Sequence, residues 1–104
     1  MFERILIVCD GNICRSPTVA AMLRELKPGK TVSSAGLVGL VGHDMESTAR
    51  AVAEENGLEC GPHTARKLDS ELCRDNDLIL VMESRQKERL SRAFPEASGK
   101  TFLL

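Results

Sequence analysis

The chain has 104 residues and a formal net charge of −1, from 14 basic and 15 acidic side chains. This length fits one domain over residues 1–104 with a modest core. The near balance of charge does not favour nucleic acid or a membrane surface as a partner. No apolar run approaches the roughly 20 residues of a membrane span, and no signal peptide is recognisable, so we expect a cytoplasmic protein.

The first half of the chain alternates between strand and helix patterns. Residues 2–8 are predicted as a strand buried on both faces, because its apolar residues are consecutive. Residues 18–27 are predicted as a helix that Pro28-Gly29 ends, and residues 31–35 as a second strand. A glycine-punctuated apolar loop follows at 36–42. The apolar stripe of the predicted helix consists of Val19, Met22, Leu23 and Leu26.

The second half continues the alternation. Residues 46–56 are predicted as a helix that Gly57 ends in the left-handed conformation. An irregular segment at 58–66, a helical turn at 69–73 and a third strand at 78–82 follow. Ser84 is predicted to cap a helix, after which a turn at 95–99 leads to a fourth strand at 100–104. This order predicts an α/β fold of three layers (αβα), with a parallel sheet and helices on both faces.

The most informative stretch is CDGNICRSP at residues 9–17, which joins the first predicted strand to the first predicted helix. Backbone N–H groups converge at such a junction, and the helix dipole favours an anion there. Gly11 and Asn12 most easily adopt the left-handed conformation that a tight cradle needs. Pro17 suits the first turn of a helix. The stretch therefore predicts an anion-binding loop.

Three side chains of this loop predict nucleophilic chemistry on a phosphate group. Cys9 lies at the strand end, where the helix terminus and Arg15 favour a thiolate. Arg15 offers a planar fork of donors that matches two phosphate oxygens. Ser16 can donate a hydrogen bond to the sulfur and ease its departure in a second step. The alternative is a buried structural cysteine beside a surface arginine, which the strand, Gly-Asn and Ser-Pro context disfavours.

The other cysteines predict neither a disulfide framework nor a zinc site, because their spacing is irregular and lacks paired C-x2-C motifs. Cys14, at the far end of the loop, could capture an oxidised Cys9 as a reversible disulfide. The alternative is that Cys14 only packs in a small pocket. Cys60 and Cys73 are interpreted as ordinary core or surface residues. We predict no metal and no cofactor.

The segment IVCDGNICRSP at residues 7–17 resembles the signature of low-molecular-weight protein tyrosine phosphatases. Further matches follow in the family's order, with VSSAGL at 32–37, GPHTAR at 61–66 and DLILVME at 77–83. The chain resembles the bacterial branch that acts on exopolysaccharide or capsule tyrosine kinases. The resemblance implies the sheet order 2-1-3-4. That order puts the end of the first strand at a topological switch point, where ligands bind in such sheets.

The resemblance also implies roles for individual residues. His63 and Arg66 match a pattern that supports the anion-binding loop at 9–17, which is the phosphate loop of the family. His63 acts through Asn12 in this pattern, and Cys14 matches the redox role. The implied substrate is a tyrosine-phosphorylated protein, such as an autophosphorylating bacterial tyrosine kinase, and inorganic phosphate is the implied inhibitor. The implied phosphate-binding positions are Gly11, Asn12, Ile13, Cys14 and Arg15.

The apolar loop at 36–42 has two interpretations. In the family the matching loop flanks the active-site cleft, so Leu37, Leu40 and Val41 are candidates for a wall against which an aromatic ring lies. Alternatively, the loop folds over the core of the domain.

Two features depart from the family pattern. Relatives continue past the fourth strand with an Asp-Pro-Tyr/Phe loop, whose Asp is the general acid, and with a last helix. Without them we expect slow phosphotyrosine turnover, residual activity on nitrophenyl phosphate, and self-association through an exposed sheet face. Asp10 stands where the family has an uncharged residue. It could repel phosphate, act as a poorly placed proton donor, or point to solvent at the cleft rim.

Two other functions are compatible with parts of this pattern. A thioredoxin-linked arsenate reductase shares the fold and the loop, but it needs a pair of resolving cysteines near the end of the third strand. Residues 81–89 contain none. A binding module or inactive remnant would hold phosphate or phosphotyrosine without turnover.

Overall fold

The computed structural model describes residues 3–104 and contains a four-stranded parallel sheet in the order β2-β1-β3-β4. The strands are β1 (Arg4–Cys9), β2 (Thr31–Gly36), β3 (Leu78–Val81) and β4 (Thr101–Leu103). The helices are α1 (Arg15–Leu26), α2 (Ser47–Glu55), α3 (Ser70–Asp75), α4 (Ser84–Ala93) and the 3-10 helix η1 (Pro95–Lys100). The predicted α/β fold and strand order are confirmed, while the predicted strand start at residue 2 lies outside the described residues.

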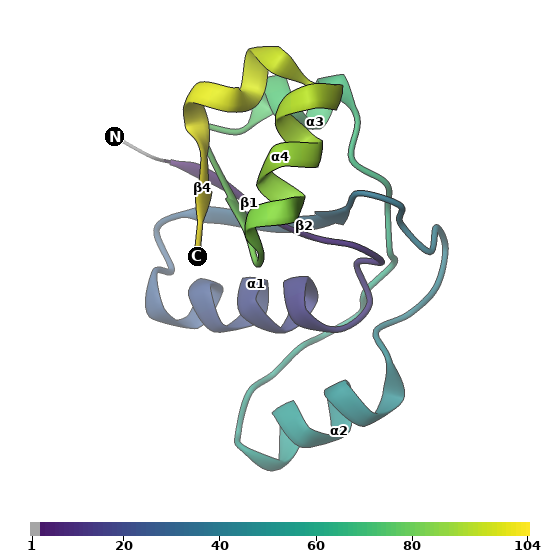
Figure 1. Ribbon diagram of the computed structural model, residues 1–104. Coiled ribbons are helices and arrows are strands. Elements are labelled where there is room, and N and C mark those ends of the chain that lie inside the picture. Colours follow the sequence, from purple (N-terminus) through teal and green to yellow (C-terminus); the bar gives the residue numbers. More distant parts are fainter. Residues whose placement is uncertain (1–2) are drawn as a thin grey trace.

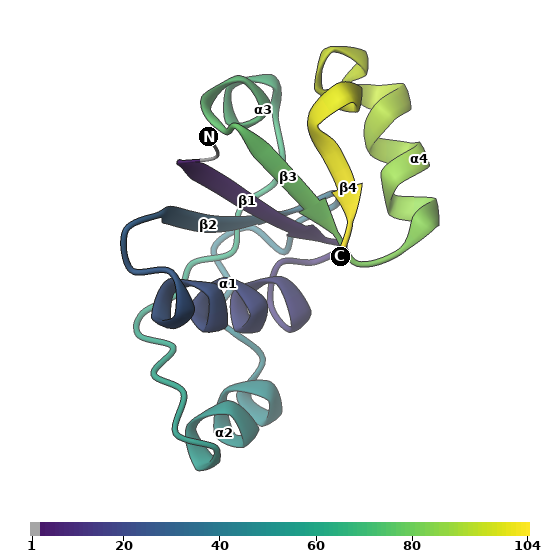
Figure 2. The ribbon, with the colours of Figure 1, turned by 90° about the vertical axis from the view of Figure 1, so that its left-hand side faces the viewer.

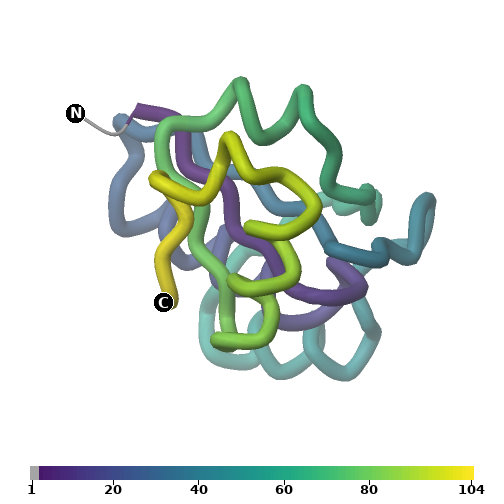
Figure 3. The backbone as a smooth tube through the Cα atoms, turned by 45° about the horizontal axis from the view of Figure 1, so that its top comes forward, coloured from purple at the N-terminus to yellow at the C-terminus, as the bar shows by residue number. Residues whose placement is uncertain are grey.

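The helices cover the sheet from both sides. In Figures 1 and 2, α1 lies against one face, and α3 and α4 lie on the other. Helix α2 lies beyond α1, farther from the strands. Figure 3 gives a third view, in which α4 and η1 lie in front of the strands and α2 lies behind. The carboxyl ends of β1, β3 and β4 converge in Figure 2, near the C-terminus of the chain.

Strand β1 is the centre of the core, as its consecutive apolar residues predict. Leu6 and Val8 pack into a cluster with residues of α3, β3 and α4, while Ile5 and Ile7 pack into a second cluster with α1 and β2. Leu6, Ile7 and Val8 have no exposed surface. Because successive side chains of a strand point to opposite faces, such a strand is buried on both sides. This burial fixes the position of β1 within the sheet, and therefore the point at which the strand ends and the loop after it begins.

Helix α1 differs from the prediction at its start and along its stripe. It begins at Arg15, so that Arg15, Ser16 and Pro17 form its first turn. Ala20 packs in the cluster with β1 and β2 and Ala21 is also buried, whereas Met22 and Leu26 are 48% and 70% exposed. Val19 and Leu23 of the predicted stripe do pack against the cluster formed by α1, β1 and β2. The prediction is therefore right for these two residues and wrong for Met22 and Leu26.

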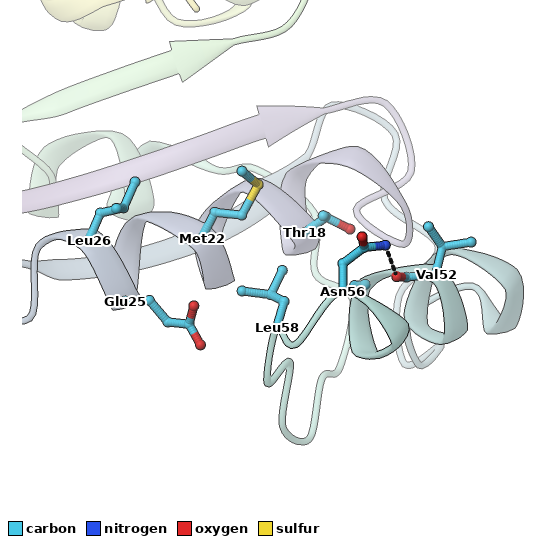
Figure 4. A pocket seen from close by; sticks show the side chains of 8 residues that line it. Thr18, Met22, Glu25, Leu26, Val52, Asn56 and Leu58 are labelled. Carbon is cyan, nitrogen blue, oxygen red and sulfur yellow. Dashed lines mark hydrogen bonds between the residues drawn. The ribbon is translucent and has the colours of Figure 1, made fainter.

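The exposed apolar side of α1 faces α2 across a groove. Figure 4 shows Met22 and Leu26 of α1 on one side, and Val52 of α2 and Leu58 on the other. The groove has a volume of about 420 Å³. None of its lining residues belongs to the phosphate loop.

The N-cap of α4 corrects the prediction, whereas the end of α2 agrees with it. Glu83, not Ser84, precedes α4 as its N-cap, and it forms a capping box with Gln86. Asp69 caps α3 by accepting a hydrogen bond from Leu72 N at 2.8 Å. The predicted turn before β4 is the 3-10 helix η1. Gly57 has a φ of 82° just after α2, as a left-handed stop requires.

None of the helices in residues 3–104 is both long and apolar enough to cross a bilayer.

Candidate active site

The candidate site lies where β1 ends and α1 begins. Cys9 is the last residue of β1 and is 4% exposed, and Arg15 is the first residue of α1. Strand β1 lies between β2 and β3, so the chain leaves it in one direction to reach β2 and later returns on the other side as β3. The carboxyl end of such a strand is the switch point at which ligands bind in open parallel sheets. The sheet therefore puts the Cys9 thiol at the position that favours a ligand.

Two hydrogen-bond donors face the sulfur of Cys9. The backbone N–H of Asn12 donates to Sγ over 3.3 Å, and Ser16 Oγ lies 2.9 Å from Sγ. Since Asn12 Nδ2 donates to Ser16 Oγ at 2.9 Å, the hydroxyl has its own proton left to donate to the sulfur. Both contacts are stronger for a thiolate than for a thiol. The surroundings of Cys9 thus suit an anionic sulfur.

Asn12 holds the loop together from a fully buried position. It has a φ of 62°, the left-handed conformation expected at this position, whereas Gly11 does not have a positive φ. The side-chain amide donates to Ser16 and, at 2.9 Å, to Ser34 Oγ, and it accepts from Arg66 N at 3.0 Å. Every polar atom of the side chain therefore has a partner, which fixes one conformation of the loop.

His63 and Arg66 both contact this part of the molecule. His63 Nε2 donates to the backbone oxygen of Asn12 at 2.6 Å. Arg66 contributes its backbone N–H to the Asn12 side chain, and its Nε donates to the carbonyl of Ser34 at 2.9 Å. The resemblance implies that His63 acts through Asn12 and names no contact for Arg66, and the supporting role of both residues stays a prediction. Ser34 is a partner that sequence reasoning did not single out.

The backbone N–H groups at the start of α1 are available to bind an anion. The first N–H that donates within this turn is that of Thr18, to the carbonyl of Cys14 at 3.3 Å. Within the described part of the chain, no protein acceptor is found for the N–H groups of Ile13, Cys14, Arg15 and Ser16. Unpaired N–H groups at a helix N-terminus form a site for phosphate or sulfate.

Arg15 is held by the carboxylate of Glu83, the residue that caps α4. Its Nη2 lies 2.8 Å from Glu83 Oε1, and both side chains are partly exposed. The hydrogen bond to Glu83 raises the pKa of the guanidinium, and the same bond lowers the pKa of the Glu83 carboxyl. The pair is therefore fully charged at neutral pH. Within residues 3–104, one of the five N–H donors of Arg15 has an acceptor, and the others remain for a ligand.

The Asp10 side chain is partly exposed, as the alternative of a solvent-facing carboxylate expects, but it is also held by helix α4. Its carboxylate accepts hydrogen bonds from Arg85 Nη2 at 2.6 Å and from Gln86 Nε2 at 3.2 Å. The hydrogen bond from Arg85 is the main cause that lowers the pKa of Asp10. A carboxyl with a lowered pKa is ionised at neutral pH, so Asp10 is a poor proton donor. The Arg85 cation also compensates its negative charge.

The loop after β2 forms one wall of the site. Leu37 N donates to the Cys9 carbonyl at 2.8 Å, and Leu40 N donates to the Gly11 carbonyl at 2.9 Å. The Leu37 side chain does not belong to an exposed wall, because it is 7% exposed and packs in the core. Leu40 and Val41 are 42% and 66% exposed and remain candidates for that wall. Leu37 thus fits the interpretation that the loop folds over the core, and Leu40 and Val41 fit the interpretation that it forms a wall for an aromatic ring.

Gly36, at the end of β2, lets the two loops approach each other. A Cβ atom at this position would lie 2.5 Å from the carbonyl oxygen of Asp10, which is closer than such atoms can come. Only a glycine fits there without moving the phosphate loop. Gly36 is thus needed because it has no side chain, which lets the end of β2 pack closely against the backbone of the phosphate loop.

The remaining cysteines are all free thiols. Cys14 is exposed, Cys60 is half-buried and Cys73 is buried. Burial raises the pKa of the Cys73 thiol, in keeping with a core position. The redox role of Cys14 stays a prediction.

Comparison with known proteins identifies the family. The family described as "Low molecular weight phosphotyrosine protein phosphatase" matches residues 4–104. The low molecular weight protein-tyrosine-phosphatase Wzb of Escherichia coli K12 is 50% identical over 103 residues, which are 99% of this chain and 70% of the relative. The chain belongs to this family.

Solved structures of relatives extend the likeness to the fold. The crystal structure of the tyrosine phosphatase Wzb from Escherichia coli K30 in complex with sulphate has a TM-score of 0.97 and 50% identity, and the match covers 99% of this chain and 72% of that one. Wzb of Vibrio vulnificus in complex with benzylphosphonate has a TM-score of 0.96 and 47% identity, covering 99% and 73%.

Proposed function

We propose that this low-molecular-weight phosphatase chain hydrolyses phosphomonoesters of tyrosine through a cysteinyl-phosphate intermediate. The observation that carries the proposal is the position of the Cys9 sulfur at the end of β1, 2.9 Å from Ser16 Oγ and 3.3 Å from Asn12 N. A sulfur that receives two hydrogen bonds beside unpaired helix N-terminal amides is suited to attack an anion that those amides bind.

In the first step, the Cys9 thiolate attacks phosphorus in line with the bond to the tyrosine oxygen. The sulfur–phosphorus bond forms, the phosphorus–oxygen bond breaks, and the electron pair leaves with the phenolic oxygen. The Arg15 guanidinium and the unpaired amides of residues 13–16 stabilise the charge on the three remaining phosphate oxygens. Because these donors are already in place, their effect is one of electrostatic preorganisation.

In the second step, water attacks phosphorus, the sulfur–phosphorus bond breaks and inorganic phosphate forms. The electron pair returns to Cys9, so the leaving group is a thiolate. The Ser16 hydroxyl, 2.9 Å from the sulfur, stabilises this developing anion. Ser16 therefore acts mainly on the second step.

We expect protonation of the phenolic leaving group to be the slow part of the first step, because the carboxyl group next to the nucleophile is a poor acid. Asp10 is the carboxyl group that follows the nucleophile, and its lowered pKa makes it a poor acid. General acid catalysis contributes about 10²–10⁴-fold, and the phenol of tyrosine has a pKa of about 10. We therefore expect slow turnover of phosphotyrosine by these 104 residues and clear activity on nitrophenyl phosphate, whose leaving group needs little protonation.

The substrate we propose is a tyrosine-phosphorylated protein, in particular an autophosphorylating bacterial tyrosine kinase. Two observations support an aromatic phosphate. The Vibrio vulnificus relative was solved with benzylphosphonate, which joins an aromatic ring to a phosphonate. In this chain the exposed side chains of Leu40 and Val41 lie on the loop that is hydrogen-bonded to the phosphate loop. Inorganic phosphate, as a product that fits the same cradle, is expected to inhibit.

Hydrolysis of nitrophenyl phosphate by the wild type and by Cys9→Ser tests the proposal, with phosphate binding measured by isothermal titration. We expect turnover only in the wild type and phosphate binding in both. Phosphate binding without turnover in the wild type would instead identify a binding module. Absence of both would refute a phosphate site altogether.

A further inference from the structure

Asp10 joins three parts of the molecule around the nucleophile. Its backbone carbonyl accepts hydrogen bonds from the N–H groups of Val38 and Gly39, both at 3.0 Å. Its carboxylate accepts from Arg85 and Gln86, in the first turn of α4. The residue next to Cys9 therefore connects the phosphate loop to the loop after β2 and to α4.

The contact with Gln86 is the buried one of the two. Gln86 has no exposed surface, and its Oε1 accepts from Met82 N at 3.0 Å and from Glu83 N at 2.9 Å. Its Nε2 donates to Asp10. The amide of Gln86 is thus fixed at both ends, and it links Asp10 to the main chain just before α4.

The path then returns to the phosphate loop. Glu83, whose backbone Gln86 holds, accepts the hydrogen bond from Arg15 Nη2 at 2.8 Å. A closed ring of contacts leaves the phosphate loop at Asp10, passes through Gln86 and Glu83, and re-enters the loop at Arg15. Arg85 bridges the same two carboxylates from outside, at 2.6 Å to Asp10 and 3.3 Å to Glu83.

We propose that Asp10 is a positioning residue, which sets the direction of the Arg15 guanidinium through Gln86 and Glu83. The inference rests on the proposed function, in which Arg15 binds the phosphate of the substrate. An arginine held in its binding orientation loses less rotamer freedom when the anion arrives, so the anion binds more tightly. The buried link through Gln86 transmits this effect, because the exposed ion pair with Arg85 is weakened by water and salt.

The test uses inorganic phosphate as the probe and the protection of Cys9 from alkylation as the readout, since this needs no turnover. Asp10→Ala removes the acceptor, and we expect phosphate to bind about tenfold more weakly. Asp10→Asn keeps an oxygen for Gln86 and should bind within about twofold of the wild type. The control is Glu88→Ala, which removes an exposed carboxylate from the same helix and should leave binding unchanged.

Two results would overturn the inference. If Asp10 acts only as a negative charge beside the phosphate, the Asn and Ala variants will both bind phosphate more tightly.

The second result comes from the double variant of Asp10 and Glu83. When Glu83→Ala is already present, Asp10→Ala should change phosphate binding by less than about twofold. Losses of binding from the two substitutions that simply add would contradict the proposed route. Thermal unfolding curves show whether each variant is folded. If Asp10→Ala shows no cooperative unfolding transition, Asp10→Ser is used in its place. A wild type that phosphate does not protect would refute the proposed function instead.

Discussion

At the scale of single residues, Asn12 and Ser16 determine how the nucleophile is presented. Asn12 bridges the loop to β2 and to the segment before α3, and Ser16 connects the Asn12 amide to the sulfur. Neither side chain is exposed. Each substitution therefore has a specific consequence, on stability for Asn12 and on the second chemical step for Ser16.

Asn12→Ala should destabilise the fold by about 2–4 kcal/mol, because buried partners lose their hydrogen bonds and alanine is strained in the left-handed conformation. Urea unfolding measures the change. Asn12→Gly is the matched control, since it restores the backbone freedom but not the hydrogen bonds, and it should recover about 1 kcal/mol. Equal stability of wild type and Asn12→Ala would mean that the side chain does not hold the loop.

Ser16→Ala should lower kcat on nitrophenyl phosphate by about 10- to 100-fold, because the departing Cys9 thiolate loses a hydrogen bond to a charged group. Since the second step is the one affected, the variant should show a burst of nitrophenol equal to the enzyme concentration. Stopped-flow absorbance measures the burst. A slow reaction without a burst would place the role of Ser16 in the first step instead.

At the scale of elements, hydrogen bonds at chain junctions fix how β1 lies against its neighbours. The Asp77 carboxylate, just before β3, accepts from the N–H groups of Glu3 at 3.0 Å and Arg4 at 2.9 Å. At the other end of β1, Gly36 and the loop after it close on the phosphate loop. The register of β1 therefore depends on contacts at both ends of the strand.

Asp77 predicts a pH dependence of stability. The hydrogen bond from Arg4 N is the main cause that lowers the pKa of Asp77 below its ordinary value of 3.8. The folded state thus prefers the carboxylate, and the contribution is present above pH 3.8 and lost as the pH falls through the lower folded pKa. Asp77→Asn should be less stable than the wild type at about pH 7, with a smaller difference at about pH 3.

Urea titrations at both pH values measure this difference. Asp75→Asn, also exposed and two residues earlier, is the control. A stability gap between Asp77→Asn and the wild type that does not change with pH would contradict the assignment.

The sequence predicts the elements better than it predicts the helix surfaces. The apolar runs and the resemblance give the sheet order and the switch point, because strand burial depends on local pattern. The stripe on α1 is wrong for Met22 and Leu26, since period alone does not say whether a helix rests on small or large residues. Ser84 is misassigned as the cap because Glu83 caps the helix equally well in combination with Gln86.

The side-chain ring of the active site could not be predicted from sequence. Asp10 and Arg85 are 75 residues apart along the chain, and Arg15 and Glu83 are 68 apart. Their pairing depends on where α4 starts relative to β1, which no local pattern encodes. Two features pointed to them: an unusual charge after the nucleophile, and a glutamate at the end of the DLILVME match.

At the scale of the whole molecule, apolar side chains remain exposed outside the active-site loops as well. Met22, Leu26 and Val52 line the groove between α1 and α2 (Figure 4). Around β4, Phe102, Leu103 and Leu104 are each about half exposed. On the α1 face of the sheet, Leu78, Leu80 and Met82 are only partly buried. Exposed apolar surface of this kind favours association.

We expect the 104-residue chain to self-associate at micromolar to millimolar concentration. Leu26→Lys replaces a 70% exposed leucine by a charge and should shift the equilibrium toward monomer. Ser98→Lys, which adds the same charge at an exposed position of η1, should have no such effect. Sedimentation velocity over a concentration series measures this, and a monomer at every concentration would exclude self-association.

The most direct test of the account is the alkylation rate of Cys9. Iodoacetamide labelling followed by peptide mass analysis distinguishes Cys9 from Cys14, Cys60 and Cys73. Because two donors and a helix N-terminus face the Cys9 sulfur, we predict labelling at neutral pH that is faster than at Cys60, and phosphate or vanadate should slow it. Labelling of Cys9 no faster than Cys60, unchanged by either anion, would contradict the presence of a phosphate cradle.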